Sequence, residues 1–137
     1  MNITVDQTAS DPSIAVMRLQ GSIDASNYES IIEEARSLHQ RGVRALLIDM
    51  GDVGFMASSG LVALHSAVMI MQNQQPPDLT AGWSAFHELA NARESGMQHQ
   101  VKLLNPQPKV QRALEMTGMT AFFEVHTDET QALASFS

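Results

Sequence analysis

Apolar and polar residues alternate along the chain with spacings that predict a series of strands and helices. Short apolar runs at residues 3–5 and 14–19 flank the turn signal SDPS, and this arrangement predicts a β-hairpin. An amphipathic helix is predicted between Ser26 and the stop signal Gly42, and Ser26 and Glu29 have the spacing of a capping box. The apolar positions that define this helix are Tyr28, Ile31, Ile32, Ala35 and Leu38.

The remainder of the chain continues the alternation of strand and helix. RALLIDM, at about residues 44–50, has the length and composition of a buried strand, and a helix is predicted from about Ser58 to Gln72. The sequence that follows becomes polar and proline-rich. We interpret about residues 73–100 as an insertion with a short helix of its own. Beyond it we predict a strand at 101–105, a helix beginning with Asn105 and Pro106, a strand at 121–126 and a closing helix over 128–136. This order predicts a single α/β domain over residues 1–137 with parallel crossovers.

The predicted helix from Ser58 to Gln72 is apolar on almost every side. Leu61, Leu64, Val68 and Met71 form one stripe, and further apolar residues occupy the other faces. A helix of this kind is normally buried all round. We expect one face to cover the sheet and the insertion to cover the rest, with a methionine-lined surface for another chain as the alternative.

Composition and charge narrow the class of protein. The chain is 44% apolar and 17% charged, which is typical of a globular domain, and it has no cysteine for disulfide or thiolate chemistry. A net charge of −7 argues against nonspecific binding to nucleic acid or to an anionic membrane. The first residues do not resemble a signal peptide, and the longest apolar run is too short to span a bilayer. We therefore expect a soluble intracellular domain.

The candidate chemistry lies in two loops at predicted strand ends. GSID carries Asp24, and GDVGFMASSG carries Asp52, Ser58 and Ser59. One serine is expected to cap the following helix. The other would lie beside unpaired amides at the positive end of the helix dipole, where a phosphate would find hydrogen-bond donors.

Catalytic and metal-binding alternatives have weaker support. A serine nucleophile needs an oriented base, but no histidine lies in a recognisable motif, and methionine stands where G-x-S-x-G requires its first glycine. No histidine pair has a convincing metal-ligand spacing. Asp24, Asp49 and Asp52 could form a magnesium pocket, although solvated or capping roles are favoured for Asp24 and Asp52. We predict neither a metal nor a cofactor.

Three segments resemble the STAS domains of bacterial anti-sigma-factor antagonists. LLIDMGDVGFMASSGLVALHSA is similar to the family signature of a strand, a turn and D-S-x-G-L at a helix start. LQGSIDASNYESI is similar to the segment before the first helix, and the sequence from VKLLN to QAL is similar to the closing strand, helix, strand and helix. The resemblance covers nearly the whole chain except residues 73–100. It implies a mixed sheet of about four to five strands with helices mainly on one face.

The resemblance also implies a protein–protein switch in the cytoplasm of a bacterium rather than an enzyme. The family antagonist binds an anti-sigma factor that is also a serine kinase with an ATP site; phosphorylation breaks the complex, and a phosphatase restores it. The phosphorylated serine before the glycine corresponds to Ser59, with Ser58 as the second choice. The implied partner-binding residues are Asp24, Met56, Ala57, Ser58, Ser59, Gly60 and Leu61. Whether the chain also forms a homodimer is left open.

Two departures from the family pattern keep alternatives open. Ala57 replaces the aspartate that usually precedes the two serines, and the insertion replaces a short loop. One alternative is therefore a STAS scaffold that binds its partner without being phosphorylated. The other is a small α/β enzyme or phosphate-binding protein that uses Ser58, Ser59 and nearby carboxylates.

Overall fold

The computed structural model describes residues 1–8, 11–74 and 97–136 of the chain. The predicted insertion lies largely outside these residues, as does its proposed short helix. The described elements are β1 (Asn2–Gln7), β2 (Ile14–Gln20), α1 (Tyr28–Gln40), β3 (Ala45–Asp52), α2 (Ser58–Met71), β4 (Val101–Leu104), α4 (Pro108–Met116), the 3-10 helix η2 (Met119–Ala121), β5 (Val125–His126) and α5 (Glu129–Ala134). The predicted order of strands and helices is confirmed.

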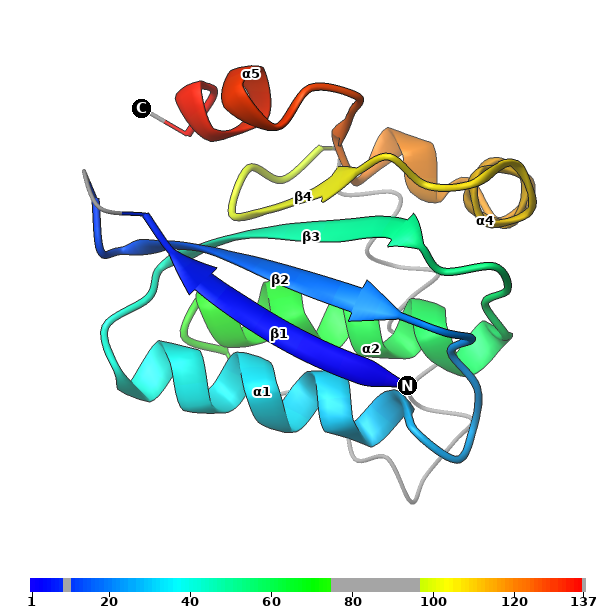
Figure 1. The fold of residues 1–137 in the computed structure, drawn as a ribbon, viewed down its shortest axis with the longest axis horizontal. Helices are drawn as coiled ribbons and strands as arrows, with labels where there is room; N and C mark the ends of the chain where they lie inside the picture. The colour runs from blue at the N-terminus through cyan, green and yellow to red at the C-terminus, as the bar shows by residue number, and fades with distance from the viewer. Residues whose placement is uncertain (9–10, 75–96, 137) are drawn as a thin grey trace.

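The described strands form one mixed sheet of five strands in the order β1-β2-β3-β4-β5 (Figure 1). The predicted hairpin is present: β1 pairs antiparallel with β2, with Ile3 opposite Leu19 and Val5 opposite Met17. The other neighbours pair in parallel. Helices α1 and α2 lie on one face of the sheet, and α5 lies on the opposite face (Figure 1). This agrees with the α/β fold and the mixed sheet that the sequence predicted.

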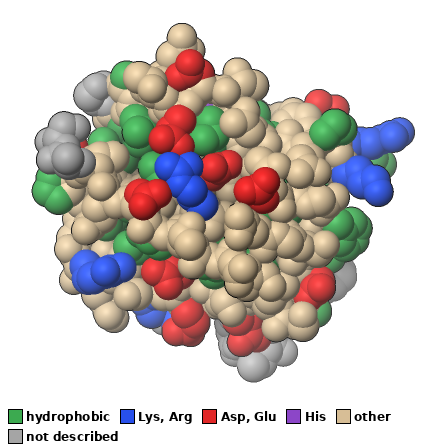
Figure 2. Space-filling view, viewed as in Figure 1, with side chains coloured by type: hydrophobic (Ala, Val, Ile, Leu, Met, Phe, Trp, Pro, Cys, Tyr) green, Lys and Arg blue, Asp and Glu red, His purple; other side chains and the backbone are tan. Residues whose placement is uncertain are grey.

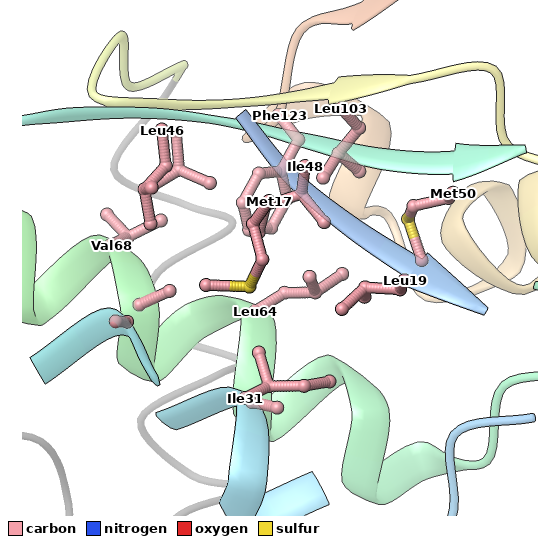
Figure 3. Close-up of a cluster of buried hydrophobic side chains, with 14 of the residues drawn as sticks. Met17, Leu19, Ile31, Leu46, Ile48, Met50, Leu64, Val68, Leu103 and Phe123 are labelled. Atoms are coloured by element: carbon pink, nitrogen blue, oxygen red, sulfur yellow. The ribbon is translucent and has the colours of Figure 1, made fainter. Parts of the chain in front are cut away.

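The main core lies between the sheet and the α1–α2 layer. Successive strand residues point to opposite faces, so every second side chain of β2 and β3 enters this core. Figure 3 shows Met17, Leu19, Leu46, Ile48 and Met50 extending from these strands toward the helices. Ile31 of α1 and Leu64 and Val68 of α2 meet them, and Leu103 and Phe123 close the layer.

Helix α2 is buried on all sides, and this accounts for its composition. From Gly60 to Met71 every residue is buried except Met69, which is half-buried. The prediction of a buried core helix is therefore confirmed, whereas the alternative of an exposed apolar face for another chain is not supported. The expectation that the insertion covers the rest of this helix concerns residues that lie largely outside the described part of the chain.

The opposite face of the sheet combines a small apolar cluster with ion pairs. Val16, Leu47 and Leu104 pack against Ala132 of α5. The Arg18 guanidinium contacts three carboxylates on different elements: Asp6 Oδ2 at 2.9 Å, Asp49 Oδ2 at 3.0 Å and Glu129 Oε1 at 2.6 Å. These ion pairs attach the start of α5 to β2.

Lys102 forms the second polar attachment on this face. Its side chain is 2% exposed, and its ammonium contacts Glu124 Oε2 at 3.2 Å. The same ammonium donates to the Ser135 carbonyl at 3.1 Å and to the Ser135 hydroxyl at 2.7 Å, and it lies 4.6 Å from the centre of the Phe136 ring. A buried cation is costly unless it is paired and hydrogen-bonded, and here both conditions are met.

Three predicted boundaries are wrong. The strand expected at 121–126 is only Val125–His126, because the chain takes a left-handed turn at Gly118 and then forms η2. Helix α4 begins at Pro108 and not at Asn105, because Asn105 has a positive φ that residues of a right-handed α-helix do not adopt. The predicted capping box is absent, since α1 begins at Tyr28 and Ser26 bonds Asp24 instead.

Candidate functional site

The two loops that the sequence singled out are joined along their backbones. The β2–α1 loop and the β3–α2 loop continue the parallel pairing of their strands through an isolated bridge between Ile23 and Met56. The Ile23 amide donates to the Phe55 carbonyl at 3.0 Å, and the Ala57 amide donates to the Ile23 carbonyl at 2.8 Å. This bridge brings Asp24, which follows Ile23, beside the start of α2.

The two serines occupy the first two positions of α2, and neither of them caps the helix. The N-cap is Ala57, whose extended backbone suits a cap but whose side chain has no acceptor. The expectation that one serine is the cap is therefore wrong. The first amides of a helix have no intrahelical acceptor, and the first turn of α2 contains no acidic residue.

Ser58 and Ser59 differ in accessibility. Ser58 is exposed. Ser59 is half-buried, and its hydroxyl oxygen is buried with no hydrogen-bond partner in the part of the chain that the structure describes. A buried hydroxyl without a partner costs free energy, so Ser59 is held in this position by the packing around it.

The other residues predicted in the partner-binding loop are mostly buried. Met56 and Leu61 are 6% and 4% exposed, Gly60 is also buried, and Ala57 is half-buried. A Cβ at Gly60 would overlap Met56 Cγ and lie 3.1 Å from Ile23 Cγ2. Gly60 therefore lets α2 begin directly over the bridge between the loops, and these buried residues shape the surface that a partner would contact.

Asp24 is half-buried and rigidly placed by a local turn. Its Oδ1 accepts from the Ser26 amide at 2.9 Å and from the Ser26 hydroxyl, and its backbone carbonyl accepts from Tyr28 at 3.0 Å. The hydrogen bonds from Ser26 hold the pKa of the Asp24 carboxyl below its usual range. The group is therefore ionised at neutral pH and presents a fixed negative charge near Ser58.

Phe55 is the surface residue that the sequence analysis missed. This residue is 51% exposed in the loop, although phenylalanine usually lies inside a protein. The signal in the sequence was an aromatic residue following Gly54 in a loop, outside any helical or strand periodicity. An exposed aromatic side chain of this kind is typical of a protein–protein contact.

The structure does not bring Asp24, Asp49 and Asp52, the three candidate magnesium ligands, together. Asp49 pairs with Arg18 on the α5 face of the sheet, away from Asp24, and Asp52 is exposed. Among the described residues no cluster of three or more histidines and carboxylates could hold a metal ion.

Supplying the missing cap at residue 57 tests the geometry of this helix start. We expect Ala57→Asp to raise the free energy of unfolding by about 1 kcal/mol, because the carboxylate can accept from the free amides of the first turn. Those bonds would lower the aspartate pKa in the folded state. The gain should therefore be present above the unfolded pKa of about 3.9 and be lost as pH falls through the folded pKa.

Urea denaturation at pH 7 and pH 3 measures this effect. Ala57→Asn is the matched control, because asparagine caps about as well as aspartate and does not titrate in this range. An unchanged stability at pH 7 in both variants would contradict the assignment of Ala57 as the N-cap.

The family of the chain follows from comparison with known proteins. The STAS domain family matches residues 7–75, just over half of the 137 residues, and the chain belongs to this family. The matched region contains β2, α1, β3 and α2, and therefore both loops of the candidate site. No curated protein sequence matches the chain.

Solved structures of low sequence identity share the fold. A Thermotoga maritima protein assigned as an anti-sigma factor antagonist has a TM-score of 0.71 at 11% identity, covering 98% of this chain and 93% of that one. An anti-sigma factor antagonist from Mycobacterium paratuberculosis has a TM-score of 0.68 at 17% identity, covering 98% and 92%. The anti-sigma factor antagonist SpoIIAA in its unphosphorylated form has a TM-score of 0.62 at 18% identity, covering 98% and 95%.

Within residues 1–8, 11–74 and 97–136, no helix is both long enough and apolar enough to cross a bilayer.

Proposed function

We propose that this chain is an anti-sigma-factor antagonist, a non-enzymatic module that binds an anti-sigma factor with serine-kinase activity. The observation that carries the proposal is the pairing of two loops of a STAS domain into one surface, with Phe55 and Ser58 exposed and Asp24 beside them. The similar fold of SpoIIAA, which is known in unphosphorylated and phosphorylated forms, supports a phosphorylation switch.

The acceptor serine is proposed from exposure. A kinase must reach the hydroxyl oxygen, and Ser58 is exposed at the first position of α2. Ser59, which the family resemblance favours, has a buried hydroxyl and could react only if the first turn of α2 opened. We therefore propose Ser58 as the acceptor, with Ser59 as the alternative.

Phosphorylation at Ser58 would change the charge of this surface. A phosphate adds about −1.5 to −2 of charge. The chain already carries a net charge of −7, and Asp24 lies beside the site. The α2 amides can hold the phosphate by the helix N-terminus, while its charge and hydration would oppose burial against a partner. A phosphatase would reverse the effect.

Phosphorylation by candidate anti-sigma kinases tests the proposal. The full chain is incubated with ATP and each anti-sigma factor kinase of the source genome, and the phosphate is located by mass spectrometry. We expect phosphate on Ser58, which Ser58→Ala abolishes and Ser59→Ala retains, and loss of the complex on phosphorylation. The reverse pattern would move the acceptor to Ser59.

Two further outcomes separate the remaining alternatives. A stable complex without phosphate transfer would favour a constitutive STAS scaffold. This is the alternative that Ala57, which has no carboxylate at the N-cap of α2, left open. Absence of any complex with all the anti-sigma factors would contradict the proposed function.

A further inference from the structure

Helix α4 presents an exposed strip that its own fold does not use. Val110 and Leu114 face the core, whereas Lys109, Arg112 and Met116 are exposed and follow one another at helical spacings of three and four. Met116 is 78% exposed, more than the other exposed large hydrophobic residues in the described part of the chain. We call these three residues the α4 strip.

The two cations of the α4 strip differ from the other described basic residues because neither has an ion-pair or hydrogen-bond partner within residues 1–8, 11–74 and 97–136. Every other basic residue that the structure describes makes an ion pair or a hydrogen bond. Arg18 and Lys102 contact carboxylates, Arg36 and Arg41 contact Glu33 and Glu34, and Arg44 donates to two backbone carbonyls. Neither kind of contact is found for Lys109 or Arg112 among the described residues.

The neighbouring acid on α4, Glu115, forms no ion pair with either cation among the described residues, and its single negative charge offsets only one of the two positive charges. Glu115 accepts a hydrogen bond from Gln111 at 3.2 Å. Figure 2 shows basic and hydrophobic side chains at the edge where Figure 1 places α4, with an acidic side chain close by and further acidic side chains over the rest of the visible face. A chain of net charge −7 thus carries one local surface that attracts carboxylates.

The α4 strip is continuous with the candidate interface. Gln107, the N-cap residue of α4, donates from its Nε2 to the Gly51 carbonyl at 2.7 Å. This bond fixes the start of α4 beside the end of β3, from which the loop with Phe55 and Ser58 continues. A partner seated on that loop therefore lies next to Lys109, and α4 extends the surface by about 10 Å from there to Met116.

We propose that the α4 strip is a second contact for the partner of the serine loop and binds a segment of that partner in which carboxylates flank an apolar side chain. The inference rests on the proposed function, since it names where the anti-sigma factor makes this contact. Charge complementarity is the reason for choosing this partner. The negative charge on the rest of the protein surface repels an acidic segment, so the α4 strip also fixes the orientation in which that segment docks.

Zero-length carbodiimide cross-linking tests the contact directly, because it joins an amine to a carboxylate only when the two touch. The chain has two lysines, and the side chain of Lys102 is 2% exposed, so Lys109 is the reactive lysine. The probe is the full chain mixed with the anti-sigma factor that binds it in the phosphorylation experiment. We expect a cross-link from Lys109 to an acidic segment of that factor, and Lys109→Arg should abolish the cross-link while retaining the affinity.

Charge reversal gives an independent measurement. We expect Lys109→Glu combined with Arg112→Glu to weaken binding about 10-fold or more and to reduce its dependence on salt. Arg36→Glu combined with Arg41→Glu is the matched control, since it makes the same charge change on α1 and should alter the affinity less than twofold. Thermal denaturation confirms that both double variants are folded.

The outcomes separate this inference from the proposed function. Binding of the wild type with no Lys109 cross-link, or with unchanged affinity after reversal on α4, would overturn the second contact and leave the antagonist function intact. A Lys109 cross-link to a second copy of this chain would overturn it in favour of self-association. If the wild type binds no anti-sigma factor, the proposed function fails and this contact fails with it.

Discussion

Replacing Glu124 with glutamine is expected to lower the free energy of unfolding by about 2 kcal/mol at pH 7, because it leaves a buried cation without its carboxylate. Glu124 Oε2 lies 2.9 Å from His99 Nδ1 and 3.2 Å from Lys102 Nζ, and its Oε1 lies 3.5 Å from His126 Nε2. The glutamine keeps the shape of the side chain and removes only the charge. The partial exposure of Glu124, 26% of its side chain, keeps the loss below that of a fully buried pair.

The effect of this substitution should depend on pH. The hydrogen bond from His99 and the nearby Lys102 ammonium hold the pKa of the Glu124 carboxyl below its ordinary value. A lowered folded pKa contributes stability that is present above the unfolded pKa of about 4.3 and is lost as pH falls through the folded pKa. The difference between wild type and Glu124→Gln should therefore shrink between pH 5 and about pH 2.

Urea denaturation of both proteins across this range provides the measurement. Glu115→Gln on α4 is the control, because this exposed residue contacts no cation in the described structure and should change stability by less than about 0.5 kcal/mol. A pH-independent difference for Glu124→Gln would show that packing, and not the charge, supplies the stability.

The second large effect concerns the serine pair, where the same substitution should have opposite results at adjacent positions. Ser58→Asp places a carboxylate at the exposed start of α2 and should raise the free energy of unfolding by about 0.3–1 kcal/mol through the helix dipole. Ser59→Asp puts the charge where the hydroxyl oxygen is buried without a partner, and should lower it by about 2–3 kcal/mol.

Ser59→Ala is the matched control for burial at this position. It removes the unpaired hydroxyl and should raise the free energy of unfolding by about 1 kcal/mol. Thermal and urea denaturation of the three variants decide the matter. Equal stability of Ser58→Asp and Ser59→Asp would contradict the burial of the Ser59 hydroxyl. If Ser58→Asp is the more stable of the two, it is the better mimic of the phosphorylated protein.

The regular elements could be predicted because the core imposes their periodicity. Alternation in β2 and β3 and the helical spacing in α1 arise from one buried face each, so the sequence carries a direct signal. AFFEVH carried a misleading signal. Phe122 and Phe123 are both buried, yet they follow the left-handed Gly118 and η2 instead of lying in a strand. An apolar run reports burial, and its backbone conformation is set by the turn before it.

The candidate site was predictable in position but not in detail. Partners usually meet an open α/β sheet at the carboxyl ends of its strands, and this marked the Asp24 and serine loops as candidates, while the family resemblance implied that they share one surface. Which serine is exposed depends on whether α2 begins at residue 57 or 58. Helix boundaries cannot be predicted from sequence to within one residue, so the sequence could not decide between the two serines. The contact between Arg18 and Glu129 joins residues 111 positions apart and has no local signature.

That contact has a consequence for the order in which the molecule can fold. The strands lie in the sheet in the order of the sequence, so each new strand adds beside the one made before it. The α5 face is completed last, because Glu129 and Ala132 follow all five strands. We therefore expect a nascent chain to expose Val16, Leu47 and Leu104 to water until α5 has left the ribosome, and this interval is when chaperones would bind it.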